Sequence, residues 1–321
     1  MKKIKKVAII GVGAIARRLL ERLEIQGCKV CFQFRRNQTG PSFEQLLTQH
    51  MPEAVFVAIS TLDKGEAARN YILKCVEVGI PVITCEKGAI AYHAKELKPY
   101  FNKIGFSATV GGGTKILNYT KDRNPNSKFV QIHVVLNGTL NFIFDEMRHG
   151  RTLGEACAEA GKLGYAEPGA NDSLSLINGE LSDIARKTCV FFNTVLSKKK
   201  FLTPKALGSF SQTSLRLKNL CDKGEDYRLV VSFSNSALTV GIKFLGKGFK
   251  TKIEGWNIFG GFRKVNGFSD FMSWLPGGVG NAIHIIEGKL GAGGKYTLSG
   301  PGAGIEPTTS AMIDDYNRLC P

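Results

Sequence analysis

The sequence has 321 residues, which is more than a single hydrophobic core usually organises, so we expect two domains. It is 43% hydrophobic and 22% charged, and its apolar runs stay shorter than the roughly 20 residues that cross a bilayer, which argues against a membrane protein. The net charge of +16 is spread along the chain without interleaved aromatic residues, so it indicates a basic surface that attracts anionic cofactors and no nucleic-acid partner.

Cysteine usage indicates a reducing compartment. Eight cysteines are scattered through a chain much larger than a disulfide scaffold, so we expect free thiols and a cytoplasmic location. Cys28 and Cys31 form a Cys-x-x-Cys, but a second pair at zinc-site spacing does not follow, so we expect no metal or redox role for them.

The first ninety residues alternate between apolar strands and amphipathic helices. This alternation is typical of an α/β fold, and it predicts a Rossmann-type, doubly wound parallel sheet. The expected strands are 7–13, 29–34, 54–60 and 81–88, and the expected helices are 14–27 and 65–79.

A glycine motif stands where the first strand meets the first helix. Gly11, Gly13 and Ala16 form a G-x-G-x-x-A. Gly11 permits a tight turn, Gly13 allows the backbone to approach a pyrophosphate, and Ala16 allows close packing of helix and strand. The amides of Ala14 and Ile15 open the helix and would face the phosphates. The motif therefore predicts a dinucleotide-binding site.

The end of the second strand predicts which dinucleotide is preferred. An Asp or Glu about 20 residues after the glycines would favour NAD, but the chain reads Phe34-Arg35-Arg36-Asn37. Two guanidinium groups can hold a 2′-phosphate, so Arg35 and Arg36 favour NADP over NAD. The alternative is a basic loop without a ribose contact. Ser60, which ends the third expected strand, is a further expected cofactor contact.

Beyond residue 105 the sequence predicts a second, α+β domain. A strand at 131–138 is followed by helical patterns at 139–150 and 152–164. Residues 196–274 contain alternating apolar segments separated by turns, which are typical of an antiparallel sheet.

Six short segments of the chain follow one another in the order found in homoserine dehydrogenases, and the sequence resembles that family over roughly 5–195 and 275–318. The segments are VITCEKGAIA, ATVGGGTKIL, LNGTLNFIFDEM, AEAGKLGYAEP, DIARK and GPGAGIEPTTSAMIDD.

The resemblance implies the short form of the enzyme, without an aspartokinase or ACT domain. It implies a dinucleotide-binding domain at 1–106 with 300–321, and a substrate-binding and dimerisation domain at 107–299. The implied reaction interconverts L-homoserine and L-aspartate 4-semialdehyde with NAD(P)(H). A homodimer serving threonine and methionine biosynthesis is implied too.

Asp183 and Lys187 are four residues apart, so they share one face of a helix and the carboxylate can orient the ammonium. An exposed surface pair is the alternative reading of this spacing. The resemblance implies that Lys187 is the general acid/base, that Asp183 assists it, and that Lys87 stands near the proton path, the substrate and the cofactor.

The resemblance also implies residues that bind substrate and cofactor. Glu167 would hold the substrate ammonium, and Tyr165 and Thr139 would line the same pocket. Gly302, with Ala303, would lie where the chain returns to the cofactor.

A monovalent cation such as Na+ is a further implication of the resemblance. Val110, Gly112 and Thr114 match the positions whose backbone carbonyls would bind it. Ser107 stands where the family commonly has an acid, so a plain glycine-rich hinge is the alternative.

Departures from the family pattern leave the substrate open. The segment 169–182 is longer than usual, and either Asp172 or Glu180 could replace a lost carboxylate. Glu86 replaces the usual Asn before Lys87, and Lys115 stands where a proline is common. Two alternatives therefore remain: an oxidoreductase acting on another small amino-acid carbonyl or imine, and a nucleotide-binding sensor without turnover.

Overall fold

The computed structural model describes residues 4–123, 128–166, 172–221, 227–235, 245–264, 275, 277–288, 293–302 and 304–321. The chain divides into two compact units. Unit 1 comprises Met1–Lys115 and Ile305–Pro321, and unit 2 comprises Ile116–Gly304. Among the described residues, no helix is both long and apolar enough to cross a membrane.

Unit 1 is built on a five-stranded parallel sheet with the strand order β2-β1-β3-β4-β5. Its central strands β1 and β3 are short apolar runs that are buried almost throughout, as expected for a parallel sheet covered on both faces. The strands are β1 (Lys6–Ile10), β2 (Lys29–Phe34), β3 (Ala54–Val57), β4 (Val82–Thr84) and β5 (Ile104–Gly105).

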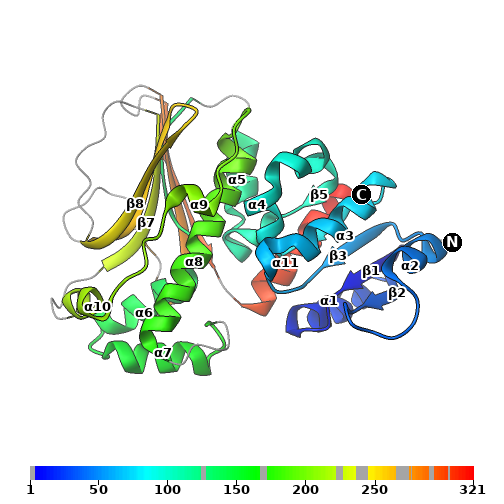
Figure 1. Cartoon of the computed structure of the whole chain (residues 1–321), viewed down its shortest axis with the longest axis horizontal. Helices are drawn as coiled ribbons and strands as arrows, with labels where there is room; N and C mark the ends of the chain where they lie inside the picture. Colours follow the sequence, from blue (N-terminus) through cyan, green and yellow to red (C-terminus); the bar gives the residue numbers. More distant parts are fainter. Residues whose placement is uncertain are drawn as a thin grey trace. The chain divides into compact units, whose positions relative to one another are not determined.

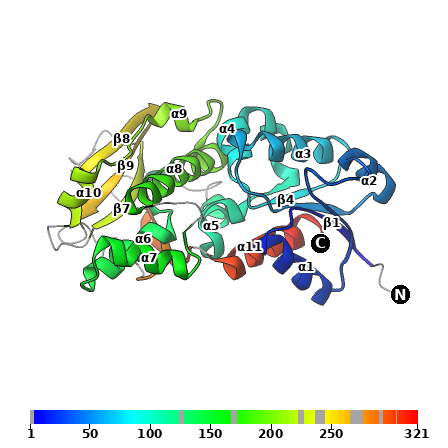
Figure 2. The same cartoon turned by 60° about the horizontal axis from the view of Figure 1, so that its bottom comes forward.

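Helices cover both faces of this sheet. Figure 2 shows α1 and α11 on one face and α2 and α3 on the other. These helices are α1 (Ala14–Ile25), α2 (Phe43–His50), α3 (Glu66–Glu77), α4 (Gly88–Leu97) and α11 (Ile305–Leu319). The core between α1, α11 and the sheet contains Leu19, Leu23, Met312 and Tyr316. The doubly wound arrangement confirms the fold class predicted for the N-terminal region.

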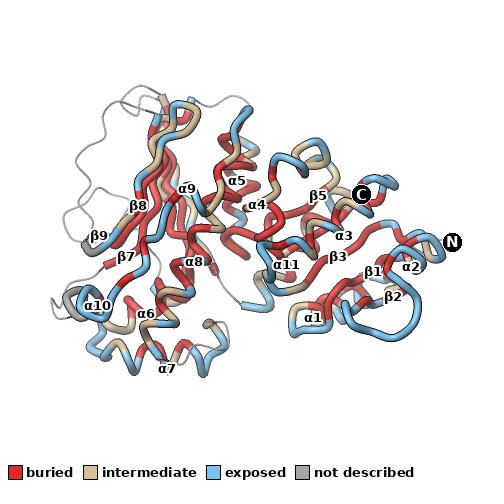
Figure 3. Tube along the Cα trace, in the orientation of Figure 1, coloured by how far each residue is buried: buried red, intermediate tan, exposed pale blue. Residues whose placement is uncertain are grey.

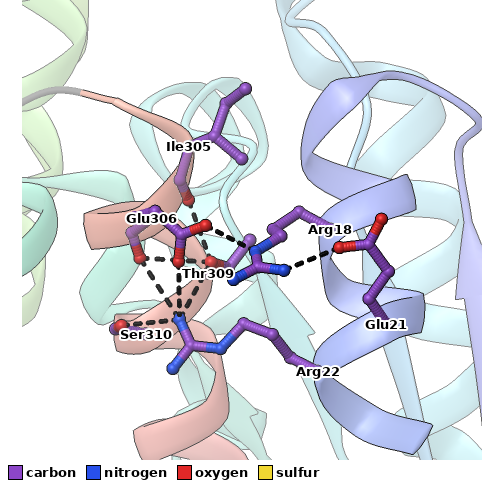
Figure 4. A network of polar contacts seen from close by, with 7 residues as sticks. All are labelled: Arg18, Glu21, Arg22, Ile305, Glu306, Thr309 and Ser310. Atoms are coloured by element: carbon purple, nitrogen blue, oxygen red, sulfur yellow. Dashed lines mark hydrogen bonds and ion pairs between the residues drawn. The ribbon is translucent and has the colours of Figure 1, made fainter.

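A polar network ties α11 to α1 although the two helices are far apart in the sequence (Figure 4). Arg22 Nη1 donates to Ser310 Oγ at 2.7 Å and to Thr309 Oγ1 at 3.2 Å, and Arg18 pairs with both Glu306 and Glu21. The network fixes the C-terminal helix on the first helix of the same unit.

Unit 2 is built on a six-stranded antiparallel sheet with the strand order β11-β10-β6-β7-β9-β8. Figure 1 labels β7 and β8 of this sheet. Between residues 196 and 274, β7, β8 and β9 pair antiparallel, which confirms the prediction for that region. Its residues 222–226, 236–244 and 265–274 lie outside the described part. The strands are β6 (Phe129–Val135), β7 (Tyr227–Ser234), β8 (Leu245–Ile253), β9 (Trp256–Lys264), β10 (Gly280–Glu287) and β11 (Gly294–Pro301).

Helices pack on the apolar face of this sheet. Phe144 of α6 contacts Phe262 of β9, and Phe191 of α8 contacts Phe233 of β7. Figure 3 shows the buried character of the strands that these helices cover. The helices of unit 2 are α5 (Ile116–Arg123), α6 (Gly138–Arg148), α7 (Leu153–Lys162), α8 (Ser173–Phe191), α9 (Pro204–Leu207) and α10 (Ser214–Cys221).

Candidate functional site

The turn after β1 requires glycine at its first position. Gly11 has φ +119°, and a Cβ there would lie 2.1 Å from the carbonyl oxygen of Ala58. Its amide donates to the Phe34 carbonyl at 2.9 Å, and its own carbonyl accepts from Gln33 Nε2 at 2.7 Å. Both hydrogen bonds therefore tie the turn to the end of β2.

The start of α1 can accommodate a phosphate. Gly13 is the N-cap, and a Cβ built there would meet no atom of the described residues within 4 Å. Ala14 is exposed, Ile15 is half-buried, and Ala16 packs in the core against the sheet. Backbone amides and the positive end of the helix dipole thus face open space, which fits a pyrophosphate.

The two arginines after β2 are exposed at the carboxyl edge of the sheet. Arg36 Nη1 lies 3.9 Å from Asp63 Oδ2, while the backbone amide of Arg35 donates to Gln38 Oε1 at 3.0 Å. Ser60, which follows β3, is exposed at the same edge. Asp63 is an acid near Arg36 that sequence reasoning missed, because it comes from a different loop.

Lys87 is half-buried at the N-cap of α4. Glu86 beside it is buried, and its two carboxylate oxygens accept from the amides of Gly88 at 2.6 Å and Ala89 at 2.8 Å. The hydroxyl of Thr61 also donates to it. The carboxylate therefore caps α4, which accounts for an acid at this position without an altered substrate.

Asp183 and Lys187 form a buried pair on α8. Lys187 Nζ lies 2.7 Å from Asp183 Oδ2, and the two side chains are only 12% and 7% exposed. The i,i+4 spacing therefore brings them together as predicted, and the alternative of an exposed surface pair is wrong. Arg186 Nη2 lies farther away, at 3.9 Å from Asp183 Oδ1.

Asn137 joins this pair to α6. Its Oδ1 accepts from the Leu140 amide at 2.7 Å and so caps α6, while its Nδ2 donates to Glu180 Oε2 at 2.6 Å and to Asp183 Oδ2 at 3.1 Å. Sequence reasoning missed Asn137. The available signal was an Asn directly before a helix, at the N-cap position that this residue type favours.

The segment 169–182 is described from residue 172 onwards. Asp172 is the exposed N-cap of α8, and its carboxylate accepts from the Ser175 amide at 2.7 Å. Glu180 is instead buried beside Asn137 and one turn before Asp183. The structure thus brings Glu180, rather than Asp172, to the charged cluster.

Thr139 and Tyr165 lie together. Thr139 Oγ1 donates to the Tyr165 carbonyl at 2.7 Å, and the Tyr165 ring stands edge-on to Phe142 at 5.1 Å between centroids. Thr139 is buried in the first turn of α6, and Tyr165 is half-buried after α7. Glu167, the expected ammonium ligand, lies outside the described residues.

The expected cation segment is a glycine-rich turn at the end of unit 1. Val110, Gly112 and Thr114 are buried, and Gly112 has φ +48°. Asp315 of α11 accepts from the amide of Ser107 at 2.7 Å, so a carboxylate is present next to Ser107 from another element. Among the described residues, no group of three or more His, Cys, Asp and Glu side chains could hold a metal.

Gly302 is buried in unit 2 directly after β11. Its amide donates to the Val279 carbonyl at 2.9 Å, and a Cβ there would lie 2.2 Å from Asn281 Cγ. Ala303 lies outside the described residues.

Cys28 and Cys31 are free thiols that make separate contacts, with Tyr316 Oη at 3.7 Å and the Val7 carbonyl at 3.2 Å respectively. Burial raises the pKa of the Cys75 and Cys85 thiols to about 12. At neutral pH these two thiols are protonated and poorly nucleophilic.

Comparison with known proteins gives a consistent result. A family model described as homoserine dehydrogenase matches residues 116–316, more than half of the chain. Homoserine dehydrogenase from Pseudomonas aeruginosa is 29% identical over 270 residues, which cover 81% of this chain and 55% of that protein. The NAD(+)-dependent homoserine dehydrogenase of Pseudomonas canavaninivorans is 27% identical over 262 residues, which cover 79% and 67%.

This chain thus spans between about half and two-thirds of the length of these two relatives. The solved structure of a hyperthermophilic archaeal homoserine dehydrogenase in complex with NADPH has a TM-score of 0.67 at 20% identity, and the match covers 99% of this chain and 98% of that one. The shared fold confirms the predicted combination of a Rossmann-type sheet and a second α/β domain.

Proposed function

Because this chain belongs to the homoserine dehydrogenase family, we propose that it is an NAD(P)-dependent oxidoreductase that interconverts L-homoserine and L-aspartate 4-semialdehyde. The observation that carries this proposal is the buried Lys187–Asp183 pair, held together with Glu180 by Asn137. A lysine that is only slightly exposed and has a fixed carboxylate partner suits proton exchange with a substrate hydroxyl.

Lys187 exchanges the hydroxyl proton of the substrate at Nζ, and Asp183 orients that ammonium through its 2.7 Å contact. Lys87 is the second lysine proposed for the proton path and substrate. When bound, the nicotinamide accepts or returns the hydride, and the protein contributes position and proton transfer.

Glu167 is proposed to hold the substrate ammonium, with Tyr165 and Thr139 beside it. Glu180 is proposed to help bind the substrate ammonium, because its carboxylate is buried in the same cluster as Asp183.

The dinucleotide is proposed to bind at the first turn of unit 1, on Gly11, Gly13, Ala14 and Ile15. Arg35 and Arg36 would contact the ribose, and they favour NADP over NAD. The further proposed cofactor contacts are Ser60, Lys87 and Gly302. The open N-terminus of α1 supports this placement. Na+ is proposed to bind the backbone carbonyls of Val110, Gly112 and Thr114.

Unit 1 is proposed as the dinucleotide-binding domain and unit 2 as the substrate-binding and dimerisation domain of a cytoplasmic homodimer. With this reaction the protein is proposed to serve amino-acid biosynthesis, towards threonine and methionine.

The proposal is tested by initial rates at 340 nm with L-homoserine and either NADP+ or NAD+. We expect turnover with L-homoserine and a much lower kcat/KM with 4-hydroxybutyrate, which lacks the amine. A Glu180→Gln variant should raise the KM for L-homoserine more than it lowers kcat. Ser182→Ala, at an exposed position on the same helix, is the matched control.

Two outcomes would contradict the proposal. Turnover of another small amino-acid alcohol or amine with none of L-homoserine would favour the alternative substrate that the long 169–182 segment suggests. Nucleotide binding without turnover of any such substrate would favour the sensor.

A further inference from the structure

Three loops meet at the carboxyl edge of the parallel sheet. Ile10 of β1 is in register with Phe34 of β2 and with Val57 of β3. The segments that follow these strands therefore leave the sheet side by side. In a sheet of this topology, the adenosine ribose of a dinucleotide lies at the end of the second strand, where Arg35 and Arg36 stand.

The loop after β3 ends in a turn with an unusual backbone. Asp63, Lys64 and Gly65 have φ values of +46°, +56° and +81°, so two residues with side chains adopt the left-handed region. Such conformations cost free energy and persist where the surrounding structure imposes them, often at ligand sites. The turn thus presents the Asp63 carboxylate at a defined place.

The start of α4 imposes this conformation. The Gly65 amide donates to the Leu62 carbonyl at 2.7 Å, and a Cβ on Gly65 would lie 2.2 Å from the Ala89 nitrogen, so the turn packs directly on α4. Thr61, just before the turn, donates to Glu86, the carboxylate that caps the same helix. Both ends of the turn are therefore anchored.

The turn places Asp63 Oδ2 3.9 Å from Arg36 Nη1, and the two side chains are 73% and 64% exposed. An ion pair this exposed contributes little to folding stability. The strained, anchored turn is therefore not explained by the ion pair that it makes, whereas a ligand at the end of β2 would contact both charged groups.

We propose that Asp63 is a specificity-determining residue for the dinucleotide, an inference that rests on the proposed function. Its carboxylate supplies the acceptor for a ribose 2′-hydroxyl that β2 itself lacks, and it repels a 2′-phosphate. Arg36 acts in the opposite sense, because its guanidinium attracts the phosphate. The balance of these two residues lets the protein bind both NADPH and NADH.

The test measures the dissociation constants of NADPH and NADH by nicotinamide fluorescence, without substrate. Asp63→Asn keeps the size of the side chain, and Asn tolerates the left-handed region, so the turn is preserved. We expect the ratio of the NADH Kd to the NADPH Kd to rise about fivefold, which corresponds to the interaction of two unit charges about 4 Å apart in water, because Asp63 is largely exposed. Arg36→Gln should lower this ratio.

Glu66→Gln is the matched control, because it removes a negative charge three residues along the chain at an exposed site on α3. A ratio that changes in Asp63→Asn and stays within twofold in Glu66→Gln supports the inference. An unchanged ratio in Asp63→Asn, or an equal change in Glu66→Gln, overturns it while leaving the proposed function intact. A wild-type protein that binds neither nucleotide overturns both.

Discussion

At the scale of single residues, the two glycines of the nucleotide motif have different physical roles. Gly11 has a left-handed φ and lies against the Ala58 carbonyl, so the fold itself requires it. Gly13 has φ −73° and faces open space, so the fold would tolerate a side chain there. The sequence motif predicts both positions and assigns the tight turn to Gly11 and the approach of a pyrophosphate to Gly13. The backbone geometry agrees with this division, because only Gly11 is required by the fold itself.

Alanine substitutions should separate these roles. We expect Gly11→Ala to lower the free energy of unfolding by about 1–3 kcal/mol, because it combines backbone strain with a steric clash. Gly13→Ala should leave that free energy within about 0.5 kcal/mol of the wild type. It should nevertheless weaken NADPH binding about tenfold, a loss of roughly 1.4 kcal/mol.

Urea unfolding and fluorescence titration of both variants provide the measurement. Equal effects of the two substitutions on unfolding and on binding would contradict this distinction.

The charged cluster of unit 2 shows where prediction from the sequence ends. The i,i+4 rule predicted that Asp183 and Lys187 share a face, because both belong to one helix. Asn137 comes from a different helix, 43 and 46 residues before its two carboxylate partners, and no local pattern indicates that contact. Local periodicity thus predicts the Asp183–Lys187 pair, whereas its burial and its contact with Asn137 depend on tertiary packing.

At the scale of elements, the α1–α11 network was equally inaccessible from the sequence. Arg22 of α1 donates to Thr309 and Ser310 of α11, which lie 287 and 288 positions later in the chain. No pattern within either helix indicates that the two helices pair. The strand and helix pattern of residues 7–34 was predictable because the apolar periods there are strong and a glycine precedes the helix.

Strands β6 and β10 place two histidines opposite each other. His133 and His284 are register partners whose rings stack at 6.4 Å between centroids, and His133 Nδ1 lies 2.7 Å from Ser232 Oγ. Burial, together with the charges of Arg263 and His284, lowers the pKa of His133 to about 3. His133 is therefore neutral in the native protein at neutral pH.

This pKa makes the stability of the sheet depend on pH. The unfolded chain binds a proton at His133 below pH 6.5 or so, whereas the native state resists it down to about 3, so stability falls as pH decreases through that window. Between pH 7.5 and pH 5.5, we expect the free energy of unfolding of the wild type to fall by roughly 1.4 kcal/mol more than that of His133→Gln.

Urea unfolding at the two pH values measures the difference. His149→Gln, the same substitution at an exposed histidine after α6, is the matched control. An identical pH dependence in His133→Gln and in the wild type would refute the assignment.

At the scale of the whole molecule, the sequence predicted two domains with the chain returning to the first at its end. The division by contacts comes at Lys115 and Ile305, whereas the sequence boundaries were placed at 106 and 300. Residues 300 and 301 belong to β11, which pairs with β10 and so belongs to the sheet of unit 2. A boundary within a continuous strand has no local sequence signal, because strand pairing is decided by a distant partner.

Lys187 is the proposed general acid/base, so its loss should stop the proposed reaction without affecting nucleotide binding. The most direct test is kcat for L-homoserine oxidation by Lys187→Met, with NADPH binding measured on the same preparation. Lys162→Met, at an exposed lysine of α7, is the control. We predict a kcat lowered about 10²–10⁴-fold, with NADPH affinity unchanged, since general acid–base groups contribute on this scale. A Lys187→Met protein that turns over L-homoserine at the wild-type rate would contradict the account.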